Sequence, residues 1–252
     1  MSSDFNERGF LGDEIRDFQQ VVLQKQNKFF ELLRQLNLYS QSKKFEIEAD
    51  AENGQQVLSL SLLAKIMNDV QSVYILCTYG LTQQSRIILR STLEGFFLLA
   101  KLVKDSSFVS VYIKADIINR LNIMKASHNY SGSLFADVRK LATEDAIREL
   151  EKQKTAENVQ RINIEAIAKS TGLGAYYDSV YRVLSQDVHS QARSLEEYVS
   201  TGGDDGIENV EWGPREEDVP TCLAMASDVL IGAGWPLMIY SNWVFNPRRK
   251  AI

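Results

Sequence analysis

The chain has 252 residues, of which 44% are hydrophobic, so it is long and apolar enough to bury a substantial core. Its formal net charge is −5, which excludes a protein that attracts nucleic acid through its overall charge. Any contact with RNA or DNA therefore requires a local basic patch, or one that oligomerisation assembles.

The two cysteines indicate a reducing compartment. Cys77 and Cys222 lie in apolar stretches and lack CxxC spacing, so we expect both in the core rather than in a disulfide framework or a zinc site. The N-terminal residues MSSDFNERGF do not form a basic region followed by an apolar run, which argues against secretion. We expect a cytoplasmic protein.

Helical periodicity governs the first half of the chain, where apolar residues recur at intervals of three and four. Gly80 is typical of a helix C-terminal stop, and Thr82 can cap the helix that follows. The pattern predicts a polar connector over 40–54 and four helices over 13–38, 55–79, 83–104 and 108–127.

The second half is less uniform. Residues 137–164 are charged and lack aromatic side chains, which predicts an exposed helix or helical pair that projects from the body. A break at 171–174 precedes a long predicted helix over 175–199. The acidic, turn-rich stretch 200–220 predicts a short β-hairpin, and a final helix over about 218–245 is expected to kink or restart at Pro236.

These elements predict an all-α fold, a helical bundle of about seven to eight helices with one short β-hairpin before the last helix. No internal repeat or composition shift marks a domain boundary, so we expect a single domain over 1–252. Within it we distinguish an N-terminal helix and connector (1–54), a helical body (55–245) and a basic tail (246–252).

One segment raises the question of a membrane anchor. Residues 229–247 carry no charge and precede Arg248, Arg249 and Lys250, which is the length and charge pattern of a tail anchor. Gly232, Gly234, Pro236 and several polar residues dilute its hydrophobicity. We therefore expect a buried core helix, and membrane association remains the alternative.

The candidate site is centred on the predicted helix 175–199. Arg182 and His189 lie seven residues apart, so in a helix they fall within roughly 20° of each other. Ser185 lies between them and Arg193 would continue the stripe. An imidazole can transfer protons near neutral pH, and guanidinium groups bind phosphate, so this face could be catalytic or could bind an anion.

The predicted helix 83–104 carries a second polar stripe, with Arg86, Arg90 and Glu94 at four-residue intervals among apolar residues. These charges must reach solvent or be paired, because an unpaired buried charge costs several kcal/mol. In the functional interpretation the stripe lies beside Arg182 and His189, and helps to orient them or to bind an anion. In the alternative, Arg90 and Glu94 form an ion pair that only fixes the helix register.

Metal and nucleotide chemistry find little support in the sequence. Neither histidine has a Glu three residues before it, HExxH is absent, and the glycine pairs match no P-loop or dinucleotide fingerprint. His128 has no partner pattern and is expected to be solvated. We expect no cofactor and no metal.

Two stretches, SRIILRSTLE (85–94) and YRVLSQDVH (181–189), carry a family resemblance. Together they resemble a bacterial domain family of unknown function, number 5677. Its pattern is a helix with Arg-x-x-x-Glu and a later helix with Tyr-x-x-Leu-Ser-x-x-x-His, followed by a short hairpin. The resemblance covers roughly residues 55–245.

The second stretch is also similar to the Arg-x(4–6)-His motif of HEPN domains, all-α proteins that include metal-independent ribonucleases of toxin–antitoxin and phage-defence systems. The resemblance implies that a homodimer brings two motifs together and that the ribose 2′-OH attacks the adjacent phosphate. Arg182 would then bind the phosphate and His189 would transfer the proton. Expected partners are RNA, a second copy, and an antitoxin or another regulatory protein.

Two functions thus remain open from the sequence. The first is a HEPN-like ribonuclease acting as a toxin or phage-defence effector. The second is a non-catalytic helical binding or scaffold module, in which Arg90, Glu94, Arg182 and His189 form a buried polar network that holds the fold or receives a small anion or a partner.

Overall fold

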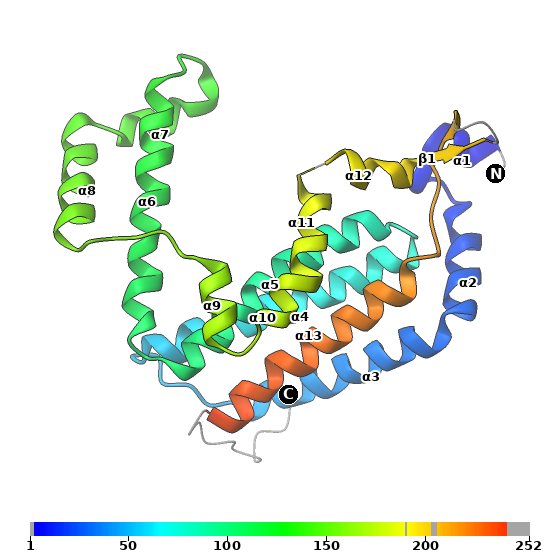
Figure 1. Cartoon of the computed structure of the whole chain (residues 1–252), viewed down its shortest axis with the longest axis horizontal. Coiled ribbons are helices and arrows are strands. Elements are labelled where there is room, and N and C mark those ends of the chain that lie inside the picture. The colour runs from blue at the N-terminus through cyan, green and yellow to red at the C-terminus, as the bar shows by residue number, and fades with distance from the viewer. Residues whose placement is uncertain (1–2, 190, 203–205, 241–252) are drawn as a thin grey trace. The chain divides into compact units, whose positions relative to one another are not determined.

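The computed structural model describes residues 3–189, 191–202 and 206–240. It confirms the all-α class, with one short antiparallel hairpin before the last helix (Figure 1). The strands are β1 (Val199–Thr201) and β2 (Ile207–Val210). The helices are α1 (Ser3–Arg8), α2 (Ile15–Lys25), α3 (Asn27–Lys43), α4 (Gly54–Thr78), α5 (Thr82–Lys104), α6 (Phe108–His128), α7 (Ala136–Leu141), α8 (Glu144–Ala156), α9 (Ile164–Ser170), α10 (Gly174–Tyr176), α11 (Arg182–Val188), α12 (Ala192–Leu195) and α13 (Val219–Tyr240).

The described chain is divided into more helices than the seven to eight predicted. The expected helix 13–38 is two helices, because the backbone leaves helical geometry at Gln26, between α2 and α3. The expected helix 175–199 runs from α10 through a π-helical turn (Tyr177–Tyr181) into α11 and ends at Val188. The last helix does not restart at Pro236, which lies within α13, and residues 241–245 of its predicted range lie outside the described part.

The chain packs as two compact units. One comprises the residues up to Lys104 together with those from Glu165 onward, and the other is Asp105–Ile164. In the larger unit, α4, α5 and α13 run alongside one another, with α3 against α13 and α11 against α5 (Figure 1). Its core is aliphatic and aromatic, and its fully buried side chains include Phe97, Leu89 and Leu223.

The smaller unit is built from α6, α7 and α8. Ile117 and Leu121 of α6 pack with Leu150 of α8 in a small apolar cluster. The Thr143 hydroxyl caps α8 by accepting a hydrogen bond from the Ala146 backbone N–H. The charged region 137–164 is therefore largely helical, as predicted, although it splits into the short α7 and the longer α8.

The turn between α4 and α5 follows the predicted stop. Gly80 has a φ of +66°, and the Leu81 N–H donates to the Leu76 carbonyl across the helix end, which is the pattern of a glycine C-cap. At the other end of α4, the Asn53 side chain accepts from the N–H groups of Gln55 and Gln56. Local capping thus fixes both ends of the helix on which α5 packs.

The β-hairpin is small and its outer strand is exposed. Val199 pairs with Val210 and Ser200 with Asn209, and a bulge follows at Thr201. All four residues of β2 are exposed. Among the described residues, no helix combines the length and apolarity needed to cross a bilayer. The end of the candidate anchor, residues 241–247, lies outside them.

We predict that Gly80→Ala destabilises the protein more than Gly172→Ala does. Both glycines have positive φ, so an added methyl group strains each by about 1–2 kcal/mol. At Gly80 the methyl would also lie 2.7 Å from the Phe18 ring and 2.8 Å from the Arg215 backbone, whereas nothing lies within 4 Å at Gly172. With overpacking added, Gly80→Ala should cost about 2–5 kcal/mol in urea denaturation. Equal losses would contradict the packing at this turn.

Candidate functional site

The centre of the polar site is a three-residue network between α5 and the π-helical turn. The Arg90 guanidinium lies 3.1 Å from Glu94 Oε1 and donates to the Tyr181 hydroxyl at 2.8 Å. That hydroxyl donates to Glu94 Oε1 at 2.6 Å, which closes the triangle. Arg90 Nε also donates to Ser185 Oγ at 3.2 Å, and its Cζ lies 4.9 Å from the centre of the Tyr181 ring. This network attaches α11 to α5.

Burial and the bond to Glu94 raise the pKa of Tyr181 well above its ordinary value, so the phenol keeps its proton and acts as a donor. The ring itself packs edge-on against Phe97 and stacks on Tyr177 at 4.9 Å. The phenol is thus held by its apolar face and its hydroxyl together.

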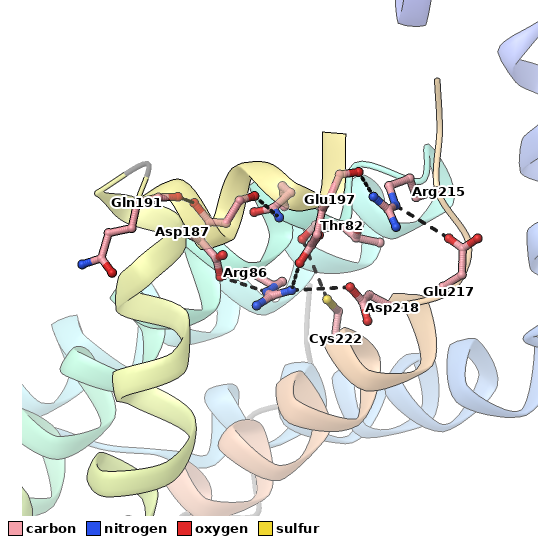
Figure 2. Close-up of polar contacts among 11 residues, drawn as sticks. Thr82, Arg86, Asp187, Gln191, Glu197, Arg215, Glu217, Asp218 and Cys222 are labelled. Atoms are coloured by element: carbon pink, nitrogen blue, oxygen red, sulfur yellow. Dashed lines mark hydrogen bonds and ion pairs between the residues drawn. The ribbon is translucent and has the colours of Figure 1, made fainter. Parts of the chain in front are cut away.

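A second network surrounds Arg86, one turn before Arg90 (Figure 2). Its Nε lies 2.9 Å from Asp187 Oδ2, and its Nη1 donates to Glu197 Oε1 at 2.6 Å and to Asp218 Oδ2 at 3.4 Å. The three carboxylates come from α11, from the 3₁₀ turn Glu196–Tyr198, and from the residue before α13. One guanidinium therefore holds three separate segments together.

The Asp187 carboxyl is the most buried member of this network, with 2% of its side chain exposed. Burial raises the pKa of Asp187 above its ordinary value, Arg86 opposes the rise, and the negative charges of Glu197 and Asp218 add to it. With three carboxylates around it, Arg86 has no free charge to offer an anionic ligand.

Backbone contacts strengthen the attachment of the segment that follows α11. The Arg215 side chain donates to the Glu197 carbonyl (Figure 2). The Arg215 backbone N–H donates to the Gly80 carbonyl at 3.0 Å. Gln83 Nε2 donates to the Ser194 carbonyl at 3.3 Å. The first turn of α5 and the turn before it thus bind the chain on both sides of the hairpin.

Arg182, His189 and Arg193 lie outside both networks. Arg182 is 57% exposed and pairs with Asp178 at 3.2 Å and Glu165 at 3.7 Å. His189 is exposed just after the last residue of α11, and within the described chain its ring has no hydrogen-bond partner. We expected Arg193 to continue the stripe of Arg182 and His189. Because α11 ends at Val188, Arg193 instead lies on α12, where it is exposed.

The predicted site residues therefore fall into two groups. Arg86, Arg90, Glu94 and Ser185 lie together inside the polar networks, and the Arg90–Glu94 ion pair is present as the structural interpretation expected. The α5 stripe, however, meets the face of α11 that carries Ser185, and does not contact Arg182 or His189 through any described hydrogen bond or ion pair.

Apart from the Arg90–Glu94 pair, the sequence interpretation missed the partners of the two arginines. The sequence interpretation gives neither Tyr181 nor Asp187 a role, although Asp187 follows Leu184 by three residues and so shares its buried face. A carboxylate on the apolar side of a helix must find a cation, which was the available signal for Asp187. Glu197 and Asp218 carried no comparable signal, because both lie in polar connections.

Neither metal ligation nor thiol chemistry is assigned to this site. Within the described residues, no three His, Cys, Asp or Glu side chains are grouped to hold a metal ion. Cys77 and Cys222 are free and buried, as predicted for core residues.

Comparison with known proteins gives one match. A family model, described as a family of unknown function (DUF5677), matches residues 56–207, which is more than half of the chain. The matched region contains both polar networks except Asp218. No curated protein and no solved structure matches the chain.

We predict that Tyr181→Phe lowers the free energy of unfolding by about 1–3 kcal/mol. The change keeps the ring but removes the hydroxyl shared by Arg90 and Glu94, so both charges lose a buried partner. The melting temperature should fall by several degrees. Tyr176→Phe is the matched control, because the Tyr176 hydroxyl makes no described hydrogen bond. An unchanged melting temperature in Tyr181→Phe would contradict the network.

We also predict a pH-dependent effect of Arg86→Met. At pH 7.5 the loss should be about 3–5 kcal/mol, since ionised Asp187 stays buried without its counter-ion. The loss should shrink at pH 5. Burial already raises the pKa of Asp187, and removing Arg86 raises it further, so the folded variant takes up a proton that the unfolded chain releases.

Urea denaturation of wild type and Arg86→Met at both pH values measures this difference. Arg148→Met removes an exposed arginine that pairs with Asp145, and should stay close to wild type at both pH values. A loss in Arg86→Met that grows toward pH 5 would refute the assignment to Asp187.

Proposed function

The chain belongs to this family of unknown function, and we propose that it is a HEPN-like, metal-independent ribonuclease that acts as a toxin or phage-defence effector. The observation that carries the proposal is the exposure of Arg182 and His189 at the two ends of α11, two helical turns apart. The other predicted residues Arg86, Arg90, Glu94 and Ser185 are engaged in holding α11 in place.

In the proposed reaction Arg182 binds the phosphate and His189 transfers a proton. The ribose 2′-OH gives up its proton as O2′ bonds to the adjacent phosphorus, the P–O5′ bond breaks, and the leaving 5′-oxygen takes up a proton. The products are a 2′,3′-cyclic phosphate and a free 5′-hydroxyl, and the one proton moved from O2′ to O5′ can pass through His189 without a metal ion. Arg182 must exchange Asp178 and Glu165 for phosphate. That exchange costs little, because exposed ion pairs contribute only about 0–1 kcal/mol.

The inner residues act in this proposal as positioning residues. Arg86 and Arg90 are occupied by carboxylates, so of the four arginines predicted at the site only Arg182 and Arg193 remain open to an anion. Arg90, Glu94 and Ser185 hold α11 against α5 and so fix the two ends of the helix in space. RNA is the proposed substrate, and a homodimer would bring two Arg182–His189 pairs together. An antitoxin or another regulatory protein would control the activity, in the cytoplasm.

A non-catalytic helical module is the second candidate, and a specific observation favours it. Arg182 lies between two carboxylates, and the strongest polar contacts in the site are internal to the fold. In this candidate the Arg90–Glu94–Tyr181 network only maintains the structure, and the protein acts through its surfaces. From the sequence, this candidate placed Arg182 and His189 in the buried network as well. Both residues are exposed, so they do not belong to it.

We predict that the purified protein cleaves RNA in the presence of EDTA and that His189→Ala lowers the cleavage rate at least about 100-fold, because a positioned acid–base group contributes that much or more. A denaturing gel of a labelled RNA measures the rate. Because His189 is exposed and has no described hydrogen-bond partner, the melting temperature of the His189→Ala protein should stay within about 1–2 °C of wild type.

Gln186→Ala, on the same helix, is the matched control and should cleave as wild type does. Arg182→Ala should also lose cleavage while keeping its stability. Equal cleavage by wild type and His189→Ala, or no cleavage by any of the four proteins, would remove the ribonuclease and leave the helical module.

A further inference from the structure

Residues 196–218, here called the hairpin segment, concentrate the negative charge of the protein. The segment holds nine acidic residues and one basic residue, Arg215, so its formal charge is −8 in a chain of net charge −5. The remainder of the chain is therefore weakly positive. Such a local excess repels itself unless a basic surface covers it.

Some of these acidic residues are already paired. Glu197 and Asp218 bind Arg86, Glu216 binds Lys25 at 2.9 Å, and Glu217 lies 3.8 Å from Arg215. Three others, Glu196, Glu208 and Glu211, are exposed and have no ion-pair partner within the described chain.

The same segment exposes large apolar side chains. Ile207 is 71% exposed and Trp212 is 80% exposed, with Leu195 and Val210 partly exposed nearby in the sequence. The two strands pair only with each other within the described chain, and an isolated two-stranded hairpin is marginally stable in water. A pocket of about 390 Å³ lies beside the hairpin and includes Glu196 and Glu211 in its lining. A protruding tryptophan next to a charged pocket is typical of a protein-binding surface.

We propose that the hairpin segment binds residues 241–252 from a second copy of the chain. These residues lie beyond the described part and read SNWVFNPRRKAI. Arg248, Arg249 and Lys250 match the three unpaired glutamates in number and sign, and Trp243, Val244 and Phe245 supply apolar surface for Trp212 and Ile207. One short segment thus complements both features of the surface.

The reach of the chain points to a second copy rather than to the same one. The pocket residues Gly213–Glu217 come just before α13, whose 22 residues carry the backbone about 32 Å away by Tyr240. A fully extended chain of five residues from Tyr240 to Phe245 spans at most about 18 Å. Trp243, Val244 and Phe245 therefore cannot return to the start of their own α13, whereas the tail of a neighbouring copy has no such limit.

This interaction predicts a dimer with a defined symmetry and salt dependence. Reciprocal exchange of the two tails closes at a dimer with two-fold symmetry. The interaction is sensitive to salt, since the pairing charges are exposed. It uses neither Arg182 nor His189, so it does not rest on the proposed ribonuclease activity.

Sedimentation velocity of the full chain between 1 and 100 µM tests the proposal. We expect wild type to form a dimer at 50 mM NaCl, and Arg248→Glu/Arg249→Glu/Lys250→Glu to weaken dimerisation at least tenfold. Glu196→Lys/Glu208→Lys/Glu211→Lys should weaken it equally, and a 1:1 mixture of the two triple variants should form a mixed dimer. Glu52→Lys/Glu144→Lys/Glu149→Lys makes the same charge change at other exposed glutamates and should dimerise as wild type does.

Carbodiimide cross-linking identifies the occupant. The dimer band should contain a peptide that joins Lys250 to Glu196, Glu208 or Glu211 of the other copy, which mixing with ¹⁵N-labelled protein reveals. A monomeric wild type, a dimer unaffected by the tail reversal, or a cross-link only within one copy would overturn the proposal. Tail-dependent binding to anionic phosphatidylserine vesicles, with no dimer formed, would also overturn the proposal and would assign the tail to a membrane.

Discussion

Two arginines one turn apart on α5 determine how the larger unit is held together. Arg86 and Arg90 lie in a helix whose buried residues are mostly apolar, and a buried cation without a partner costs several kcal/mol. Each guanidinium therefore stays paired only while the segments that supply its partners remain packed against α5. Arg90 holds the π-helical turn and α11 through Tyr181 and Ser185, and Arg86 holds the end of α11, the hairpin segment and the start of α13 through three carboxylates.

This pairing separates residues that stabilise the fold from residues that are open to a ligand. Tyr181, just before α11, and Ser185 and Asp187 within it face α5, while Arg182 at its start and His189 just after its end are exposed to solvent. A single helix of seven residues can serve both purposes because successive side chains rotate by about 100° around its axis. The proposed catalytic pair is thus attached to a rigid support without being part of it, which is why its removal should affect activity and not stability.

The net charge of −5 conceals an uneven distribution. The hairpin segment alone has a formal charge of −8, and Arg182 is flanked by Asp178 and Glu165. A polyanionic substrate would approach this chain most easily from a direction that avoids the hairpin segment. If a basic tail from a second copy covers that segment, dimerisation also lowers the repulsion. The two proposals use different residues, and they meet only in the expectation of two copies.

The sequence alone determined the all-α class, the hairpin before the last helix, and the bounds of α4, α5 and α6 to within one or two residues. These features depend on hydrophobic periodicity, on caps such as Asn53 and on the left-handed glycine at position 80, all of which act over a few residues. It also indicated that Arg86, Arg90 and Glu94 must either be paired or reach solvent. Only the tertiary structure decided the partners, because Asp187, Glu197 and Asp218 lie more than 100 residues from Arg86, and packing brings them to it. The end of α11 at Val188, which places Arg193 on a different helix, was decided in the same way. No local pattern distinguishes it from a continuing helix, and the chain must turn there to bring Glu197 back to α5.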